Sequence, residues 1–282
     1  MKYYFAVDIG GTKTAVAVYD ERYRQLRYAR MNTEPSAGAE KLAEKIRRMT
    51  FDWPELQVLS ASCIACPGPL SRETGRVFNN TTLGWKNVCV TQLFADAFGT
   101  SFSILNDCNA GALGAAKDYD GTLVYLSIST GIGGGIVSGG RLFEGAGNAA
   151  EFGHLAVKRG RGLKCGCGRT DCLELYASGT AVEKAYFELT GERASGEVLA
   201  RKAQAGDEKA LDVYHEAAVR VNDALADILT MIDPDRVVVG GGAVESPIRR
   251  FIRLPDVSKA MLSFANGDHV LLGAARVAAE GL

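Results

Sequence analysis

The chain has 282 residues, of which 47% are hydrophobic and 23% are charged, and its formal net charge is −1. Such a length suits one large domain or, more readily, two domains of about 100–180 residues each. The near-neutral charge gives no electrostatic reason to expect a nucleic acid or an anionic membrane as a partner. No apolar run approaches the roughly 20 residues that a membrane span needs.

The N-terminal segment and the cysteines indicate the compartment. MKYYFAVDIGG predicts a strand and a turn, whereas a signal peptide needs a longer apolar core and a small-residue cleavage site. The chain has seven cysteines, an odd number, and no secretory signal. Both features favour a reducing compartment, and we expect a cytoplasmic protein.

Strand and helix patterns alternate in the first half of the chain, so the predicted fold class is α/β. Residues 3–9 and 14–20 are β-rich runs joined by the tight GGTK, which predicts a hairpin. In chain order we then expect a helix over 38–50, a buried strand over 58–66, a helix over 90–99, a strand over 101–107 and a helix over 108–116.

The opening pattern recurs in the second half of the chain. A strand over 122–128, the turn STGIGG and a strand over 135–143 again give a hairpin, roughly 120 positions after the first. Two glycine-rich turns in equivalent places predict a duplicated domain with both turns facing one cleft. We expect further helices over 178–191, 195–206, 208–232 and 271–281, and a strand within 233–244 that runs into a glycine loop or a helix start.

The two glycine-rich turns carry the first candidate chemistry. Asp8 ends a strand beside Gly10, Gly11 and Thr12, where a carboxylate can reach a hydrated Mg²⁺ while loop amides and the Thr12 hydroxyl bind phosphate oxygens. Lys13 would add a positive charge. A plain hairpin turn explains the same residues equally well.

The second turn favours anion binding more clearly. Its predicted residues are Thr130, Gly131, Gly133 and Gly134. Glycines so closely spaced weaken a strand unless the backbone must approach something closely.

Asn106 and Asp107 follow the predicted strand of 101–107 at the point where a helix begins. A carboxylate at the C-terminal end of a buried strand is a usual position for catalysis in α/β sheets. The alternative is that Asp107 only caps the helix that follows, which is a common role for aspartate.

One histidine and three cysteines gather within nineteen positions as His154, Cys165, Cys167 and Cys172. They supply one nitrogen and three sulfurs, the tetrahedral set of a structural zinc site with no open position. A disulfide is disfavoured by the compartment, and a glycine loop that happens to contain thiols is the remaining alternative. Cys63 and Cys66 form a C-x-x-C motif within an apolar strand, which indicates buried core thiols.

Several of these motifs occur together in one known order. DIGGTKTAVAV, PGPL, LND, STGIGGGIV, EFGH, CGCGRTDCLE and DPDRVVVGGG resemble, over almost the entire chain, the ROK family of sugar kinases and sugar-responsive repressors. The resemblance implies an actin- and hexokinase-like fold of two ribonuclease-H-like domains around a cleft. We place the first domain at 1–112 with 271–282 and the second at 113–270.

The resemblance also implies residue roles. Asp107 matches the family's general base and Asn106 a sugar-binding residue, while Glu151, His154 and Glu174 match residues that bind sugar hydroxyls. Phosphates and Mg²⁺ would be served by Asp8, Gly10, Gly11, Thr12, Lys13, Thr130, Gly131 and Gly133, and Gly240, Gly241 and Gly242 would lie near the adenosine. Asn79 and Asn80 lie where the family's sugar-proximal motif is blurred, so their contact with sugar is left open.

The expected activity is that of an ATP-dependent sugar kinase acting on a hexose hydroxyl, the 6-OH first of all, with glucose as the first substrate. Fructose, mannose, N-acetylmannosamine and N-acetylglucosamine are the alternative sugars. A sugar-sensing transcriptional regulator is disfavoured because Asp8 leaves no room for a preceding helix-turn-helix, so it would lack its own DNA-binding domain. A catalytically dead sugar-binding protein is a third alternative. The family further implies a homodimer.

Overall fold

The computed structural model describes residues 1–265 and 268–281, which divide into two compact units. The first unit comprises 1–119, 140–142 and the C-terminal segment 268–281. The second comprises 120–139 and 143–265. The boundary expected after residue 112 would fall inside a helix that belongs wholly to the first unit.

The first unit is built on a five-stranded sheet with the order β3-β2-β1-β4-β8. β1 (Tyr3–Ile9) and β2 (Lys13–Asp20) form the predicted antiparallel hairpin, and β3 (Gln25–Asn32) extends it antiparallel to β2. β4 (Ala61–Cys66) lies parallel to β1, and β8 (Ser103–Asn106) lies parallel to β4. The catalytic candidates therefore follow the outermost parallel strand.

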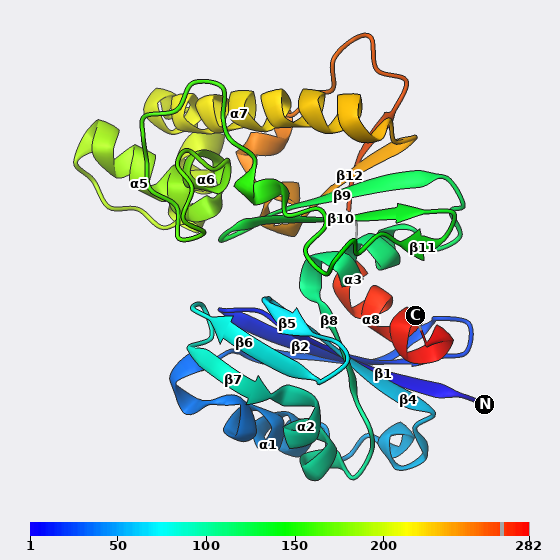
Figure 1. Ribbon diagram of the computed structural model, residues 1–282. Coiled ribbons are helices and arrows are strands. Elements are labelled where there is room, and N and C mark those ends of the chain that lie inside the picture. The colour runs from blue at the N-terminus through cyan, green and yellow to red at the C-terminus, as the bar shows by residue number, and fades with distance from the viewer. Residues whose placement is uncertain (266–267, 282) are drawn as a thin grey trace. The chain divides into compact units, whose positions relative to one another are not determined.

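Two helices cover one face of this sheet. α1 (Ala39–Met49) and α2 (Val90–Phe98) share a core with Phe5, Val7 and Ile9, which point to the same side because strand side chains alternate. Figure 1 shows both helices beneath this sheet. Gly99 follows α2 in a left-handed conformation, which agrees with the prediction that this helix ends at a glycine.

The opposite face of the sheet is covered by α8 (His269–Glu280), which packs on β1 and β4 and against α3 (Asp107–Ala115). The alternation that turns Val7 toward α1 turns Asp8 toward this face. The C-terminal helix is thus part of the surroundings of the first candidate site.

A smaller antiparallel sheet in the first unit comes from the region that the sequence left without elements. It has the order β5-β6-β7, with β5 (Leu70–Ser71), β6 (Arg76–Asn80) and β7 (Trp85–Cys89). Two short 3₁₀ turns, η1 (Pro35–Ala37) and η2 (Pro54–Val58), flank α1.

The second unit repeats the topology of the first. Its sheet has the order β11-β10-β9-β12-β13, in which β9 (Thr122–Ile128) and β10 (Ile132–Ser138) form an antiparallel hairpin. β12 (Arg236–Gly240) is parallel to β9, and β13 (Met261–Phe264) is parallel to β12. The sheet order also includes β11 (Arg141–Leu142), whose residues are grouped with the first unit. A hairpin followed by two parallel strands thus occurs twice, which confirms the predicted duplicated α/β fold.

The second hairpin differs from its prediction in where the turn ends. Gly133, Gly134 and Gly135 lie within β10, and only Ser129–Gly131 form the turn, so the expectation that Gly133 and Gly134 belong to the turn is wrong. A methyl group on Gly134 would lie 2.2 Å from a ring carbon of Phe152. Gly134 is needed because η3 (Phe152–His154) packs directly on the strand.

The helices of the second unit form largely where the sequence predicts them. They are α4 (Glu174–Ala177), α5 (Gly179–Thr190), α6 (Gly196–Gln204) and α7 (Glu208–Ile232), with the 3₁₀ turns η4 (Gly241–Val244) and η5 (Pro247–Arg250). Ser178, Ser195 and Asp207 cap α5, α6 and α7 with side-chain oxygens.

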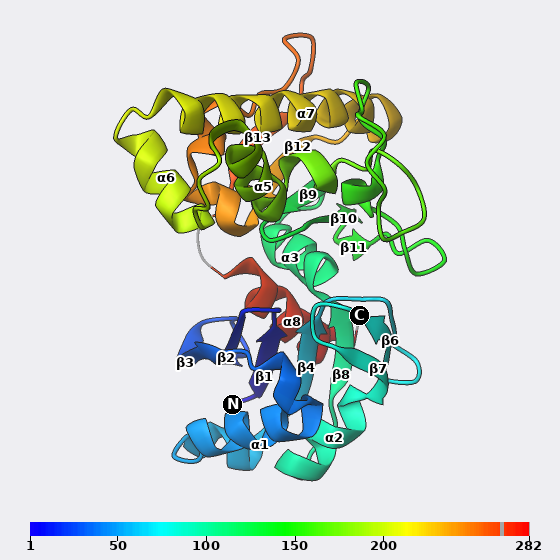
Figure 2. The ribbon, with the colours of Figure 1, turned by 90° about the vertical axis from the view of Figure 1, so that its left-hand side faces the viewer.

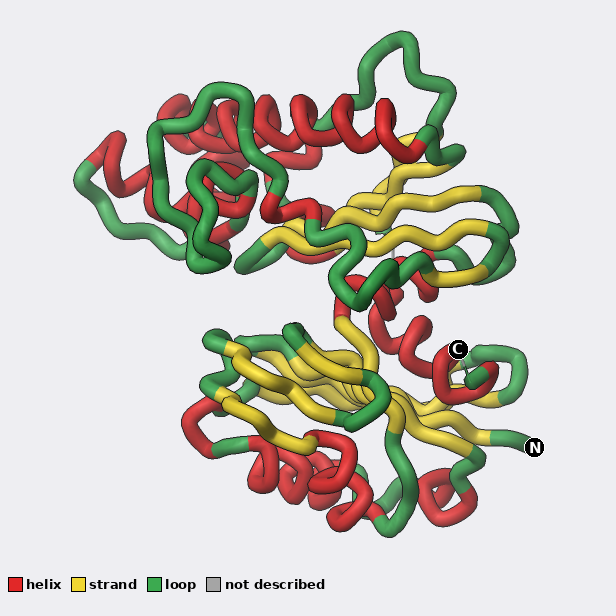
Figure 3. Tube along the Cα trace, in the orientation of Figure 1, coloured by secondary structure: helices red, strands yellow, loops and turns green. Residues whose placement is uncertain are grey.

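One long helix dominates the core of this unit. The buried side of α7 packs in one cluster with Val124, Leu126 and Val239 of the sheet. Figure 2 shows α7 running along the sheet with α5 and α6 beside it, and Figure 3 shows the sheet strands in yellow. Within the two described ranges, no helix has both the length and the apolar character to cross a membrane.

The crossing of α3 and α8 yields a test of the fold. A methyl group on Gly273 would lie 1.7 Å from the carbonyl oxygen of Ala110, so Gly273→Ala must push the two helices apart. We expect the free energy of unfolding to fall by about 2–3 kcal/mol in urea titrations. Gly166→Ala is the matched control, because a methyl group there would meet no atom within 4 Å. Equal stability of the two variants would contradict the close crossing.

Candidate functional site

The turn between β1 and β2 is held by one backbone hydrogen bond of its own and by one from the residue after β3. The Gly10 N–H donates to the Lys13 carbonyl at 2.9 Å, and Thr12 accepts from the Thr33 N–H at 2.9 Å. A methyl group on Gly11 would lie 2.2 Å from Thr82, so glycine admits the turn that joins β6 and β7. The Lys13 ammonium donates to the Asn32 side chain on β3.

Asp8 lies at the end of β1 among other carboxylates of the first unit. Burial raises the pKa of Asp8 well above its ordinary value, and the negative charges of Asp268 and Asp107 raise it further. The Arg30 guanidinium acts in the opposite direction on the pKa of both Asp8 and Asp268. The first unit therefore concentrates negative charge in a poorly solvated place, where a divalent cation would relieve the repulsion.

Asn106, and not Asp107, caps α3. The Asn106 side-chain oxygen accepts from the N–H groups of Cys108 at 2.9 Å and Asn109 at 3.1 Å. The alternative role of Asp107 as the helix cap is therefore wrong, since the preceding residue fills it. Both lone pairs of the Asn106 oxygen are engaged, so a bond from Asn106 to a ligand would use its NH₂ group.

Asp107 is the first residue of α3, and its carboxylate accepts the Cys108 N–H at 2.9 Å. Burial raises the pKa of Asp107, while this hydrogen bond opposes the rise. A carboxylate with a raised pKa is a better proton acceptor than an exposed one, as a general base needs. Asp107 therefore meets the electrostatic condition for the role implied by its sequence motif.

The buried cysteines of β4 take no part in this chemistry. Burial raises the pKa of Cys63 to about 11, and burial together with the charges of Asp107 and Asp8 raises that of Cys66. Thiols with raised pKa values are poor nucleophiles. Both sulfurs behave as core side chains.

Asn80 is buried and bonded within the first unit. Its NH₂ group donates to the carbonyls of Pro67 at 2.9 Å and Gly68 at 3.1 Å, and its oxygen accepts from the Leu83 N–H at 2.7 Å. Asn80 therefore connects the loop at Pro67 and Gly68 to the turn at Leu83, and its side chain is engaged within the protein. Asn79, the next residue back on β6, is exposed.

The turn between β9 and β10 is anchored to the region after the cysteines. Thr130 is exposed, and its carbonyl accepts from the Thr180 hydroxyl at 3.0 Å. The Glu174 carboxylate accepts the Ile132 N–H at 3.1 Å and lies against Gly131, where a methyl group would approach it to 2.6 Å. Glu174, predicted as a sugar ligand, is thus also a support of the predicted phosphate turn.

Two of the three glycines at the end of β12, Gly240 and Gly241, admit close packing. Gly240 ends the strand beside Tyr125, and a methyl group there would lie 2.0 Å from the tyrosine hydroxyl. Gly241 has φ +73° and lies against the Ile128 carbonyl, while Gly242 belongs to the same 3₁₀ turn, η4. The sequence alternatives of a loop or a helix start are resolved in favour of a short 3₁₀ helix.

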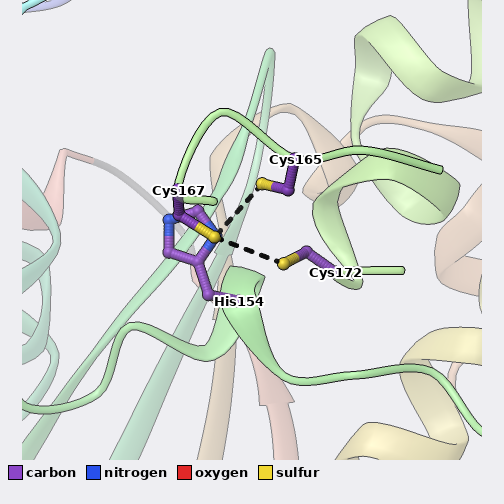
Figure 4. Close-up of side chains that lie close together, drawn as sticks. All are labelled: His154, Cys165, Cys167 and Cys172. Carbon is purple, nitrogen blue, oxygen red and sulfur yellow. Dashed lines mark hydrogen bonds between the residues drawn. The ribbon is translucent and has the colours of Figure 1, made fainter. Parts of the chain in front are cut away.

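The four predicted metal ligands converge in the second unit. The ligand atoms of His154, Cys165, Cys167 and Cys172 all lie within 4.8 Å of one another. The sulfurs of Cys167 and Cys172 are 3.6 Å apart, and the Cys165 sulfur is 3.7 Å from His154 Nδ1. Figure 4 shows the four side chains directed toward one another.

These distances fit a zinc ion. Zn–S bonds of about 2.3 Å and a Zn–N bond of about 2.0–2.1 Å give a tetrahedron with edges of about 3.5–3.8 Å. The separation of Cys167 and Cys172 is much longer than the roughly 2.05 Å of a disulfide. Because His154 turns Nδ1 toward the sulfurs, its Nε2 is the atom available to a second partner. The donor set therefore fits structural zinc.

Backbone hydrogen bonds hold the cysteine loop, the segment from His154 to Cys172, in its conformation. The Leu173 N–H donates to the Leu155 carbonyl at 2.8 Å, which places Cys172 beside the strand-like segment after His154. The Cys165 N–H donates to the Arg169 carbonyl at 2.9 Å. Glu151 precedes η3, the 3₁₀ turn that contains His154.

Four residues near these sites were not predicted. Asp268 and Arg30 join the charges around Asp8, and Thr82 contacts Gly11. Asp171 accepts several hydrogen bonds beside the cysteines. The only sequence signal was that Asp268 precedes a helix as a cap, since contacts between distant segments leave no local pattern.

The duplicated sheets and the glycine turn in each define an α/β protein of the actin and hexokinase type, with a loop whose Cys₃His donor set fits a zinc ion. The sequence profile of the ROK family matches residues 4–267. The chain belongs to the ROK family.

Three proteins similar to this chain are sugar kinases. A glucokinase of Streptomyces coelicolor is 31% identical and covers 97% of this chain and 96% of its own. An N-acetyl-D-glucosamine kinase of Pectobacterium atrosepticum is 29% identical over 85% and 83% of the two chains. The crystal structure of a ROK glucokinase from Streptomyces griseus, in complex with glucose and AMPPNP, is 29% identical with a TM-score of 0.83 and covers 99% of this chain and 100% of its own.

The raised pKa of Asp8 predicts how stability depends on pH. The folded state disfavours the ionised carboxylate, so wild-type stability falls as pH rises from the ordinary value of 3.8 through the raised pKa of the folded protein. Asp8→Asn should therefore raise the free energy of unfolding at pH 7, on the order of 1 kcal/mol. The gain should shrink as pH falls toward 3.8.

Urea titrations across pH check this expectation, with exposed Asp118→Asn as the control. A gain for Asp8→Asn that stays constant with pH would contradict the electrostatic cause.

Proposed function

We propose that the protein is an ATP-dependent sugar kinase that transfers the γ-phosphoryl group to a hexose hydroxyl, the 6-OH, with glucose as the first substrate. The observation that carries the proposal is the partly buried carboxylate of Asp107 at the start of α3, with its raised pKa and with the capping role taken by Asn106. Family membership and the similarity to glucokinases support it.

Asp107 supplies the proton chemistry in this proposal. Phosphoryl transfer needs little covalent chemistry from the protein, because the attacking hydroxyl and the leaving phosphate must mainly be aligned and their charge stabilised. The Asp107 carboxylate would orient the sugar hydroxyl and accept its proton as the new O–P bond forms. Asn106 would donate from its NH₂ group to a neighbouring sugar oxygen.

The two glycine turns would bind the phosphates of ATP. In the first, backbone N–H groups of Gly11 and Thr12 and the Thr12 hydroxyl are suited to phosphate oxygens, and in the second those of Thr130 and Gly131. Asp8 would hold hydrated Mg²⁺, which neutralises charge on the phosphates when bound. Gly240 to Gly242 are assigned to the adenosine side, with Lys13 as an added charge.

The Cys₃His site serves sugar recognition rather than catalysis. Zinc with four protein ligands has no open position to activate water, so its role is to fix the loop. His154 would then bind a sugar hydroxyl through Nε2, with Glu151 and Glu174 accepting hydrogen bonds from others. The expected homodimer and cytoplasmic location remain predictions.

A phosphorylation screen tests the proposal and the choice of sugar. We expect ATP-dependent phosphorylation of glucose, measured as ADP release, with Asp107→Asn losing about 10³-fold or more in kcat. Because Asn keeps the size of Asp107, sugar binding measured by calorimetry should persist. The exposed Asp118→Asn should retain full turnover.

The screen must include fructose, mannose, N-acetylmannosamine and N-acetylglucosamine. Preference for one of these would replace glucose and keep the kinase. Sugar binding without ADP release from any of them would indicate a sugar-binding protein, and full turnover by Asp107→Asn would exclude Asp107 as the base.

Metal analysis tests the assignment of the cysteine loop. We expect about one zinc per chain, and a loss of sugar affinity of about 10-fold or more in Cys167→Ser with nucleotide affinity unchanged. Cys89→Ser, which changes a thiol outside the cluster, is the matched control. Unchanged sugar affinity in zinc-depleted Cys167→Ser would separate the metal from sugar binding.

A further inference from the structure

Asp171 lies in the cysteine loop but is not one of the four clustered ligands. It directly precedes Cys172 and has φ +57°, a left-handed conformation that is uncommon for residues other than glycine. Aspartate tolerates this conformation better than most residues, but it still needs compensation. The compensation is found in the contacts of its carboxylate.

The carboxylate of Asp171 accepts hydrogen bonds from three consecutive backbone N–H groups. The Arg161 and Leu163 N–H groups donate to Oδ1 at 3.1 and 2.8 Å, and the Gly162 N–H donates to Oδ2 at 3.1 Å. The Tyr176 hydroxyl also donates to Oδ1. We call these five residues the Asp171 clamp.

The backbone around the clamp is fitted to the carboxylate. A methyl group on Gly160 would lie 2.1 Å from the carboxyl carbon of Asp171, so only glycine lets the chain wrap so closely. The Arg161 N–H also donates to the Tyr176 hydroxyl at 2.6 Å, and the Arg161 guanidinium lies 5.6 Å from the centre of the Tyr176 ring. The main chain of Asp171 itself pairs with Leu163 and Val157.

The clamp acts on both sides of the predicted sugar ligands. Tyr176 lies on α4, which begins at Glu174, so the bond from its hydroxyl ties that helix to the segment 160–163. The Val157 N–H donates to the Asp171 carbonyl at 2.9 Å, three residues after His154. None of these hydrogen bonds uses a ligand atom of the Cys₃His cluster.

We propose that Asp171 is a positioning residue that holds the loop from 155 to 176 in its sugar-binding conformation independently of the metal. The proposal rests on the proposed function, because the residues that the clamp positions, Glu174 and His154, are taken there to bind the sugar. The loop then has two separate restraints: zinc ties His154 to the cysteines, and the clamp ties 160–163 to α4.

Two variants separate the carboxylate from the backbone conformation. Asp171→Gly accepts φ +57° and removes all four side-chain bonds, whereas Asp171→Asn also tolerates this φ and keeps a neutral acceptor. Asp118→Asn is the matched control, because Asp118 has φ +60° but is exposed and lies outside the loop.

We expect Asp171→Gly to raise KM for the sugar about tenfold, with kcat and KM for ATP changed by less than about twofold and zinc content unchanged. Asp171→Asn should recover part of the loss, and Asp118→Asn should behave as wild type. An unchanged sugar KM in Asp171→Gly would overturn the proposal. Loss of zinc would also overturn it, because the effect on KM would then be indirect. So would a fall in kcat together with a rise in KM for both the sugar and ATP.

A second measurement does not depend on activity. In chelator-treated protein, hydrogen exchange at the amides of 161–163 should remain slow in wild type and become at least about tenfold faster in Asp171→Gly. Equal exchange in the two metal-free proteins would refute the clamp. If the wild-type protein phosphorylates no sugar, the kinase proposal fails, while this exchange experiment still decides whether the clamp holds the loop.

Discussion

The close packing of η3 on β10 is the constraint on which the rest of the second unit's site depends. Gly134 on the strand and Gly153 on the 3₁₀ turn both lack a side chain at the contact, where a methyl group would lie 2.2 Å from Phe152 and 2.1 Å from the Ile132 carbonyl. The turn therefore lies directly on the sheet. This packing fixes the position of His154, from which the cysteine loop departs.

The first unit is organised around a different constraint, the burial of negative charge. Burial raises the pKa of each of Asp8, Asp107 and Asp268, and the negative charges of Asp268 and Asp107 raise that of Asp8 further. A fold selected only for stability would replace them with neutral side chains. Their presence is understandable if they bind a cation and a substrate hydroxyl, because these partners offset the free-energy cost of keeping ionised carboxylates away from water.

The sequence predicted the elements whose signals are local. Both hairpins, the helices from α5 to α7 and the four clustered ligands follow from period, capping residues and ligand spacing. The predictions failed where the decisive contact is distant. The contact that places Gly134 within β10 is with Phe152, which is not adjacent in the sequence. The contribution of Asp268 to the charge around Asp8 depends on how α8 packs.

The residue that caps α3 also could not be predicted from the sequence alone. Asn106 and Asp107 are adjacent, and both are good capping residues, so composition alone cannot choose between them. The backbone decides, because Asn106 has extended φ and ψ while Asp107 already lies in the helix. Once Asn106 takes the cap, the neighbouring carboxylate is available for chemistry.

The predicted phosphate turns and the cysteine loop depend on different kinds of contact. Each of the two turns predicted to bind phosphate lies within a single hairpin, so its geometry follows from a few adjacent residues. Glu151, His154 and Glu174, which are predicted to bind sugar, instead lie at η3 and α4, at the two ends of the cysteine loop. The Cys₃His cluster and the Asp171 carboxylate contact this loop at separate points. A loop held at points can change between them without disturbing the hairpins or Asp107. In the proposed kinase, sugar preference can therefore vary while the transfer chemistry stays the same.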